Sequence, residues 1–376
     1  MKILVIANDT FTLFKFRYDM LKSLVNEGFE VYAVGPDDEY AGEIVKIGIT
    51  YNKIEYLRTS LNPLSDVNLY KKYKNHIKKV SPDIVFTYNL KPNIYGILAA
   101  YNLGCRRIFA MIPGAGYVFS DISFKSRIIK KIIYPLYRSS LQKATNVFFQ
   151  NPDDQEEFLR MKLVRNHQCV QIFGSGVNMD EFELEKLPEK ISFVFLARLL
   201  KVKGIREYCQ AAHKVRKHYP NTSFHVVGGI DDNPTTIDTN ELECFIENDD
   251  IIYHGKADDV RPYLRQASVM VLPSYHREGV PHSILEAMAM GRAIITTNSV
   301  GCRETVIDGV NGLLVNVQDV KDLEEKLMWI LKNPDLVHEM GEQSFRICSG
   351  KFDVKIINSI ILKTMNIQKD LNYISS

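Results

Sequence analysis

The chain alternates short apolar runs, rich in β-branched and aromatic residues, with longer stretches of helical periodicity. In the first half, strands are expected at 2–7, 30–34, 83–87, 107–111, 146–149 and 170–173. Helices are expected between them, for instance at 15–27, 67–80 and 93–102. Such alternation is typical of a parallel sheet with helices on both faces. The pattern therefore predicts an α/β fold of the doubly wound, Rossmann-like type.

The same alternation starts again after residue 190. Strands are expected at 192–197, 223–229, 250–255 and 267–273, and a helix at 205–217. A chain of 376 residues exceeds the usual size of one domain. The small residues of 174–178 separate the halves, and 356–372 has helical periodicity. We expect one domain over 1–174, completed by a helix at about 354–376, a second over 175–353, and a substrate cleft between them.

The first expected strand is followed by a loop without glycine, residues 8–14. A dinucleotide approaches such a turn closely only where glycines make room for its diphosphate. This loop therefore argues against a nicotinamide-dependent dehydrogenase, although the fold class would allow one. We expect no organic cofactor.

Composition narrows the environment of the protein. The six cysteines are scattered and form no CxxC pair or metal-ligand spacing, so we expect reduced thiols and no metal site. The apolar run at the N-terminus is too short for a signal sequence, and no segment is long enough to span a bilayer. We expect a cytoplasmic protein.

Two carboxylates eight residues apart, Glu278 and Glu286, follow the expected strand at 267–273. Pro281 suits the first turn of a helix, and Gly291 is placed to end it. The free N–H groups and the dipole at a helix start favour a phosphate. The carboxylates beside it can bind the hydroxyls of a ribose and of a sugar.

Two cations occupy the corresponding place after the strand at 192–197. Arg198 lies where that strand ends, and Lys203 lies where the next helix starts. Ligands of parallel sheets bind at the carboxyl ends of strands. An arginine and a lysine there can neutralise a departing diphosphate.

These motifs, in this order, resemble the retaining glycosyltransferases of the GT-B fold, sequence family 4, with their Glu-x7-Glu signature. The resemblance implies that Glu286 holds the ribose of a nucleotide sugar and Glu278 contacts the donor sugar. It implies that Arg198 and Lys203 act on the diphosphate and that the base lies against Lys256 and Ala257. Main-chain groups of the helix start would also contact the donor: Gly279, Val280, Pro281, His282 and Ser283.

The segments 88–96 and 112–119 resemble a bacterial branch of this family that assembles O-antigen, capsule or glycoprotein-type glycans on a polyprenyl diphosphate. The residues expected to meet the lipid-linked saccharide acceptor are Arg17, Asn89, Lys91, Gly114 and Gly116. For Lys91, a plain surface lysine is an equal alternative.

Charge is unevenly distributed along the chain. Residues 1–170 carry 24 Lys and Arg against 16 Asp and Glu, hence +8, and the remainder carries 23 against 29, hence −6. The segment 123–143 mixes cations with isoleucines, leucine and tyrosines, as an interfacial helix would, with an interruption expected at Pro135. We expect contact with an anionic membrane through Lys125, Arg127, Lys130 and Lys131, and therefore peripheral attachment to the inner face of the cytoplasmic membrane. The lysines of 71–79 are expected to form a solvated helix face.

The expected function is transfer of a hexosamine or galactose, with retention and without metal, from a UDP-sugar to a lipid-linked saccharide. A GDP donor remains open, because the base would be read by main-chain groups. No nucleic-acid partner is expected. One alternative is a UDP-sugar 2-epimerase of the same fold, for which His282 would be an acid–base candidate. The other is a non-catalytic protein that binds sugar nucleotides or lipid diphosphates.

Overall fold

The computed structural model covers residues 1–376 and describes all but 59–61, 115–123, 232 and 368–376; in 124–132 it describes the backbone alone. The chain divides into two compact domains. The N-terminal domain comprises Met1–Ser175 and Lys355–Ser376, and the C-terminal domain comprises Gly176–Val354. These bounds lie within about one residue of the division expected from the sequence.

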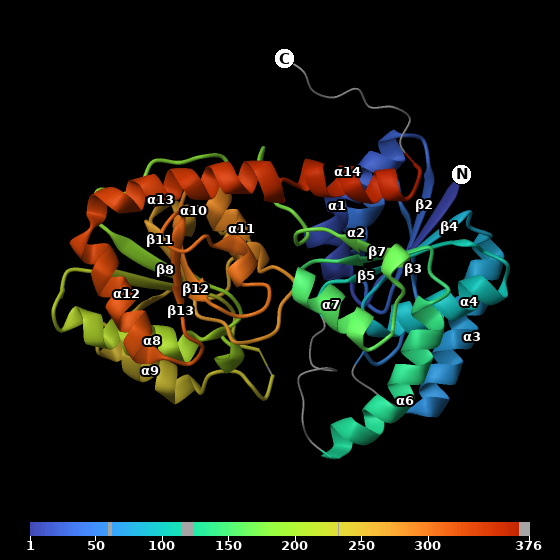
Figure 1. Ribbon diagram of the computed structural model, residues 1–376, viewed down its shortest axis with the longest axis horizontal. Helices are drawn as coiled ribbons and strands as arrows, with labels where there is room; N and C mark the ends of the chain where they lie inside the picture. The colour runs from blue at the N-terminus through green and yellow to red at the C-terminus, as the bar shows by residue number, and fades with distance from the viewer. Residues whose placement is uncertain (59–61, 115–123, 232, 368–376) are drawn as a thin grey trace. The chain divides into compact units, whose positions relative to one another are not determined.

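The N-terminal domain is built on a parallel sheet with the strand order β3-β2-β1-β4-β5-β6-β7 (Figure 1). Its strands are β1 (Lys2–Ile6), β2 (Glu30–Gly35), β3 (Thr50–Lys53), β4 (Ile84–Tyr88), β5 (Arg107–Ile112), β6 (Asn146–Phe149) and β7 (Cys169–Gln171). Its helices are α1 (Thr10–Asn26), α2 (Ala41–Lys46), α3 (Pro63–Val80), α4 (Ile97–Asn102), α6 (Phe124–Leu141), α7 (Pro152–Arg160) and α14 (Val354–Thr364).

Alternate residues of each central strand enter two separate hydrophobic cores. On β1, Leu4 and Ile6 pack with α3, α4 and α6, whereas Ile3 and Val5 pack with α1 and α14. Both faces of the sheet are covered, as expected for a doubly wound fold. The final helix returns to this domain, where Ile357 and Ile361 are buried in the second core.

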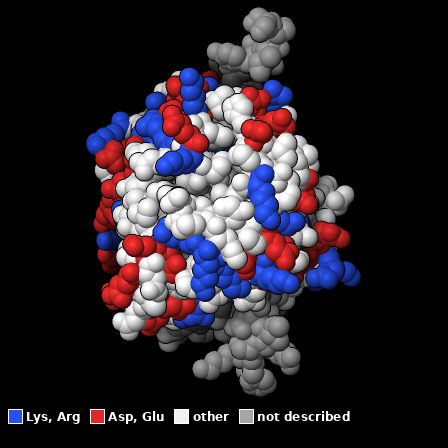
Figure 2. All heavy atoms as spheres, turned by 90° about the vertical axis from the view of Figure 1, so that its left-hand side faces the viewer, with Lys and Arg blue, Asp and Glu red and all other residues white. Residues whose placement is uncertain are grey.

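The C-terminal domain repeats this plan with a six-stranded parallel sheet of order β10-β9-β8-β11-β12-β13. Its strands are β8 (Ser192–Leu196), β9 (Ser223–Val227), β10 (Ile252–Tyr253), β11 (Val269–Leu272), β12 (Ala293–Thr297) and β13 (Gly312–Val315). Its helices are α8 (Ile205–Arg216), α9 (Thr239–Glu247), α10 (Arg261–Arg265), α11 (His282–Ala289), α12 (Val320–Lys332) and α13 (Pro334–Ile347). Figure 2 views the side of the molecule at the left of Figure 1, where this domain lies; Lys and Arg are interspersed with Asp and Glu.

Several element boundaries differ from the sequence prediction. α1 begins at Thr10 instead of residue 15, because Asp9 caps it by accepting from the Thr12 amide at 2.7 Å. α6 continues through Pro135, where the sequence suggested an interruption. α14 ends at Thr364 instead of 372. Strands β3, β12 and β13 were not expected.

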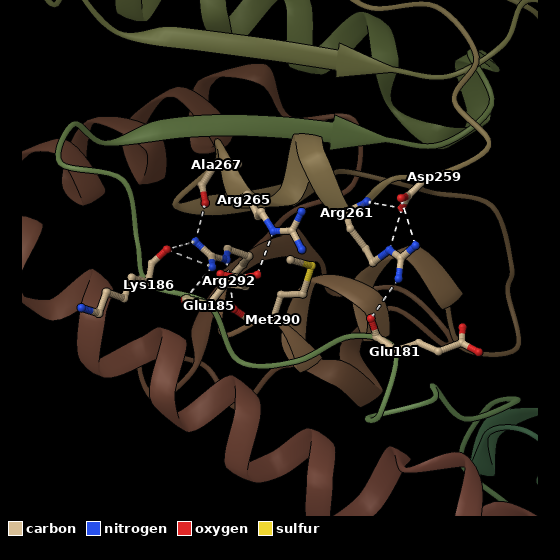
Figure 3. Close-up of polar contacts among 9 residues, drawn as sticks. All are labelled: Glu181, Glu185, Lys186, Asp259, Arg261, Arg265, Ala267, Met290 and Arg292. Carbon is tan, nitrogen blue, oxygen red and sulfur yellow. Dashed lines mark hydrogen bonds and ion pairs between the residues drawn. The ribbon is translucent and has the colours of Figure 1, made fainter.

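Arg292, at the start of β12, is completely buried and fixes the turn that follows α11 (Figure 3). Its guanidinium donates to the carbonyls of Glu185 at 2.7 Å, Ala267 at 2.9 Å and Met290 at 3.1 Å. The Lys186 carbonyl accepts from both terminal nitrogens at 3.3 Å. Arg292 thereby joins the segment that enters the C-terminal domain, at Glu185 and Lys186, to the amino-terminal edge of the sheet.

Candidate functional site

The predicted donor residues lie in two loops that leave neighbouring strands. β8 and β11 are adjacent and parallel, so their carboxyl ends meet at one edge of the sheet. The loop after β8 carries Arg198 and Lys203, and the loop after β11 carries Glu278. This edge is where open α/β sheets bind ligands.

The two loops are tied together by one carbonyl, that of Val202. It accepts from the Ser274 hydroxyl at 3.2 Å, the Tyr275 amide at 3.0 Å and the His276 amide at 3.1 Å. The turn before α8 depends on Gly204, whose φ is +82° and where a Cβ would lie 2.2 Å from the Pro273 carbonyl oxygen. A residue other than glycine there would push the two loops apart.

Lys203 and Glu278 form the central contact of the site. The Lys203 ammonium lies 2.5 Å from Glu278 Oε1, and the side chains are only 15% and 12% exposed. The Ser274 hydroxyl donates to the same carboxylate oxygen at 2.9 Å. Burial raises the pKa of Glu278, but the charge and hydrogen bond of Lys203, the charge of His276 and the hydrogen bond from Ser274 together outweigh it, so the net pKa lies below the usual value. Glu278 is therefore ionised at neutral pH, beside a cation.

His276 belongs to this cluster, although the sequence gave no signal for it. Burial lowers the pKa of His276; the charge of Glu278 opposes this, and those of Lys203 and Arg198 add to it. The imidazole is thus neutral near pH 7 and can accept or donate a hydrogen bond. A lone histidine in a loop has no spacing that marks it, and only the folded loop brings it to the carboxylate.

Glu286 is buried on α11, eight residues after Glu278 in the sequence. Its carboxylate lies 3.2 Å from the His282 imidazole, one turn earlier on the helix. Pro281 directly precedes the helix instead of occupying its first turn, and Gly279 and Val280 are buried in the connection. Gly301 supports that connection, since a Cβ there would lie 2.5 Å from the carbonyl oxygens of residues 278 and 279. Ser283 is half-buried in the first turn.

Arg198 and the base-binding candidates are more exposed. The Arg198 side chain is 63% exposed and contacts Asp231 at 3.3 Å, a weak surface pair. It is therefore free to turn toward an anion. Lys256 and Ala257 follow β10, and the Gly228 amide donates to the carbonyl of Gly255 at 2.9 Å, beside them. Lys256 is exposed and Ala257 half-buried.

Arg17 occupies a comparable edge in the N-terminal domain, at the carboxyl ends of β4, β5 and β6. Its side chain is 2% exposed and its guanidinium lies 5.2 Å from the ring of Tyr88, the last residue of β4. Gln150, just after β6, accepts from Nη2 at 3.1 Å in the amide orientation that also lets it donate to the Pro113 carbonyl. Nε and Nη1 have no hydrogen-bond partner among the described residues.

The other acceptor candidates divide into two groups. Asn89 and Gly114 directly follow Tyr88 and Pro113 at the same edge of the sheet, and both have positive φ. Lys91 does not join them: it is buried and its ammonium lies 2.8 Å from Asp66. The alternative, a plain surface lysine, is wrong because the side chain is buried. Gly116 lies outside the described residues.

The start of α1 is already occupied by carboxylates. Asp9 caps the helix, and Asp37, after β2, accepts from the amide and the hydroxyl of Thr10. A second anion would be repelled there. In this domain, positive charge is instead offered by Arg17, about two turns farther along α1.

The described residues contain no group of three or more His, Cys, Asp or Glu side chains arranged to hold a metal ion. Within the same residues, no helix is long and apolar enough to cross a membrane.

The cations and carboxylates of the C-terminal site can together bind a diphosphate and neutral hydroxyls. The side chains of Lys125, Arg127, Lys130 and Lys131, predicted to meet a membrane, lie in the part of α6 whose side chains are not described.

Two family models match the chain. Residues 178–346 match glycosyl transferases group 1, and residues 2–151 match the model described as glycosyl transferase 4-like. The two matched segments correspond to the two domains.

Two curated relatives match over most of their length. N,N'-diacetylbacillosaminyl-diphospho-undecaprenol alpha-1,3-N-acetylgalactosaminyltransferase from Campylobacter jejuni is 30% identical, over 89% of this chain and 91% of its own. UDP-Gal:alpha-D-GlcNAc-diphosphoundecaprenol alpha-1,3-galactosyltransferase from Escherichia coli is 25% identical, over 93% and 90%.

Solved structures agree in fold. A glycosyltransferase from Rickettsia africae superposes with a TM-score of 0.81 at 20% identity, covering 97% of both chains. Anabaena HepE in complex with UDP-glucose gives 0.79 at 17% identity, covering 98% of this chain and all of that one. The arrangement of two Rossmann-like domains is thus that of the GT-B glycosyltransferases.

Proposed function

This chain belongs to the group 1 (family 4-like) glycosyltransferases of the GT-B fold, and from that premise we propose that it extends a saccharide carried on a polyprenyl diphosphate. The donor is a UDP-linked N-acetylhexosamine or galactose. Two relatives that match over most of their length are named for transfer of these sugars to diphospho-undecaprenol-linked saccharides. The accepting group is a sugar hydroxyl, since both relatives form a 1,3 linkage.

The observation that carries this proposal is the buried pair of Lys203 and Glu278, joined at 2.5 Å where β8 and β11 end. In the donor complex, Lys203 and Arg198 neutralise the diphosphate as it leaves. Glu278 orients the donor sugar, and Glu286 accepts from the ribose hydroxyls. Displacement occurs on one face of the sugar, and a donor phosphate oxygen takes the acceptor proton.

His276 acts as a positioning residue in this scheme. Its amide is held by the Val202 carbonyl, and its neutral ring faces the charges of Glu278 and Lys203. A neutral imidazole can donate to a sugar hydroxyl without adding a charge that would compete with Lys203.

On the acceptor side, we assign the lipid diphosphate to Arg17, with Asn89 and Gly114 beside it. Two nitrogens of this buried guanidinium have no partner among the described residues, none of which supplies the counter-ion that such a charge requires. A diphosphate supplies both charge and acceptor oxygens. The lipid of this acceptor would keep the enzyme at the inner face of the cytoplasmic membrane.

Transfer of radiolabel from UDP- and GDP-sugars to butanol-extractable lipid, with and without EDTA, tests the proposal. We expect label from one UDP-sugar with or without EDTA. Lys203→Ala and Glu278→Gln should each reduce kcat by about a hundredfold or more, the usual scale for a group that stabilises transition-state charge. Lys201→Ala, two residues before Lys203, is the matched control and should retain activity.

The alternatives give different products. Release of an epimerised sugar without lipid label would indicate the 2-epimerase. Binding of UDP-sugar without any turnover would indicate the non-catalytic protein. Equal activity of Lys203→Ala and Lys201→Ala would refute the proposed role of the Lys203–Glu278 pair.

A further inference from the structure

The outer face of α3 carries exposed apolar side chains in its first turns and lysines in its later turns. Leu69, Tyr73 and Ile77 pack inward, so the opposite side of the helix faces solvent. Its first turns present Leu64, which is 81% exposed, and Val67, which is 53% exposed. Leu64 is the most exposed large hydrophobic side chain among the described residues.

Leu57 extends this apolar end, because a buried ion pair fixes its backbone against α3. The Lys91 ammonium lies 2.8 Å from the carboxylate of Asp66 on α3 and donates to the carbonyl of Leu57 at 3.0 Å. Leu57 is 74% exposed, second only to Leu64 among the large hydrophobic residues described. Three apolar side chains therefore project from neighbouring backbone, although burying them would be favourable by the hydrophobic effect.

The later turns of the same helix face are basic. At 3.6 residues per turn, Lys71, Lys72, Lys78 and Lys79 all fall within about a quarter-turn of the line through Leu64. Within the described structure, none of them pairs with a carboxylate, and the one acid of α3, Asp66, belongs to the buried pair. This lysine face contrasts with the mixed charges seen in Figure 2.

A groove of about 550 Å³ runs beside these lysines. Its lining residues are Lys53, Ile54, Glu55, Lys72, Asn75, His76 and Lys79. Within the described residues, the Nε2 atom of His76 is buried without a hydrogen-bond partner. Lys53 is compensated by Asp38 and Glu55, at 2.9 and 3.1 Å, so Lys72 and Lys79 supply the positive charge. The groove has the size and donors to receive a phosphate headgroup.

We propose that this face, Leu57, Leu64 and Val67 with the lysines of α3, docks on an anionic phospholipid surface. The apolar side chains enter the interfacial region, and the lysines meet lipid phosphates. We favour a lipid surface over a protein partner for two reasons. The exposed leucines match the apolar layer of a membrane interface, and the neighbouring lysines, which pair with no carboxylate in the described structure, match its anionic headgroups. The inference rests on the proposed function only in its biological use, which is to bring the enzyme to a lipid-linked acceptor. It replaces the sequence-based expectation that these lysines are merely solvated.

Flotation of the full chain with vesicles tests the proposal. We expect binding to vesicles that contain phosphatidylglycerol and little binding to phosphatidylcholine alone. Each lysine near an anionic surface strengthens binding by about fivefold, so Lys71→Gln/Lys78→Gln/Lys79→Gln should weaken it by roughly a hundredfold. Leu57→Ser/Leu64→Ser should weaken it by at least about tenfold. Free inorganic phosphate at millimolar concentration should not displace the protein.

The matched control is Lys217→Gln/Lys321→Gln/Lys332→Gln, three surface lysines of the C-terminal domain. It removes the same net charge and should bind like the wild type. Wild-type binding by the α3 variants, with loss in Lys130→Gln/Lys131→Gln, would overturn the proposal in favour of α6. Displacement by free phosphate would overturn it in favour of a soluble ligand. Circular dichroism confirms that each variant is folded.

A transfer assay separates this proposal from the proposed function. On a short-chain, water-soluble acceptor the α3 variants should keep wild-type activity, whereas with long-chain acceptor in vesicles they should lose it. A wild type that binds vesicles but transfers nothing to either acceptor would refute the proposed function and leave the docking surface supported. Equal activity of wild type and variants on vesicles would show that transfer to the lipid-linked acceptor does not need the docking surface.

Discussion

Arg17 and Arg292 are both buried arginines, one in each domain, but their surroundings differ. Arg292 is 0% exposed and donates to four backbone carbonyls, those of Glu185, Lys186, Ala267 and Met290 (Figure 3). Arg17 is 2% exposed, and Nε and Nη1 find no acceptor among the described residues.

The comparison shows that a buried arginine points to a ligand when its N–H groups lack acceptors, and not because it is buried. Burial lowers the pKa of Arg292 to about 10, but its carbonyl partners offset the lost hydration. Burial also lowers the pKa of Arg17, for which the Tyr88 ring and Gln150 are the compensating contacts among the described residues. Equal burial therefore accompanies opposite roles: Arg292 maintains the fold, whereas we expect Arg17 to await an anion.

The largest expected effect is the loss of stability in Arg292→Met. The substitution leaves four carbonyls without their donor and should cost about 3–5 kcal/mol in the free energy of unfolding. Urea unfolding measures it. Arg265→Met is the control, because Arg265 forms only an exposed pair with Glu185 and should change stability by less than about 1 kcal/mol. Similar losses in both variants would contradict the role given to Arg292.

Arg17→Met should have the opposite signature. Removing an uncompensated buried charge should leave the free energy of unfolding unchanged or raise it by about 1–2 kcal/mol. Transfer to the lipid-linked acceptor should fall by about a hundredfold, mostly through the KM for that acceptor, because the charge-assisted bonds to its diphosphate are lost. A destabilised but active variant would show that Arg17 is structural, like Arg292.

Pyrophosphate should stabilise the wild type more than Arg17→Met. A ligand at about a hundred times its Kd raises the free energy of unfolding by about 2.7 kcal/mol. Since we propose a second diphosphate site in the C-terminal domain, the comparison uses a Lys203→Ala background. Equal stabilisation of Lys203→Ala and Lys203→Ala/Arg17→Met would place the anion elsewhere.

The smallest expected effect is a pH dependence at Glu278. Its folded pKa lies below the usual value of 4.5, so its stabilisation is present above that pH and is lost as the pH falls through the depressed value. The advantage of the wild type over Glu278→Gln should be about 1–2 kcal/mol at pH 6, the scale of a charged hydrogen bond. It should shrink steadily below pH 4.5. A constant difference across this range would mean that the pair contributes nothing.

The sequence was sufficient for the architecture and for the position of Lys203 and Glu278 at one edge of the sheet. Buried parallel strands are continuous apolar runs, so β1, β6 and β11 were visible without a structure. Lys203 and Glu278 could be placed because each follows such a strand, and the edge where strands end is shared. Their direct contact agrees with that placement.

The rest depended on contacts that no local pattern encodes. β3 is a half-exposed edge strand of sequence TYNK, which has no apolar run. β12 follows α11 so closely that its apolar residues merge with those of the helix. The partner of Lys91 is Asp66, 25 residues earlier. The surroundings of Arg17 are formed by residues at the carboxyl ends of three different strands. Distant pairings of this kind decide whether a lysine or arginine is free.

The return of α14 to the N-terminal domain has a consequence for synthesis. The C-terminal domain is complete at Val354, whereas the second core of the N-terminal domain also requires Ile357, Ile361 and Met365. On the ribosome, the half that emerges first must therefore wait for the last residues, with part of its hydrophobic surface uncovered. The half that emerges second can finish folding before it. A released chain that ends shortly after Val354 should accordingly hold a folded second domain beside a first domain that still binds chaperones.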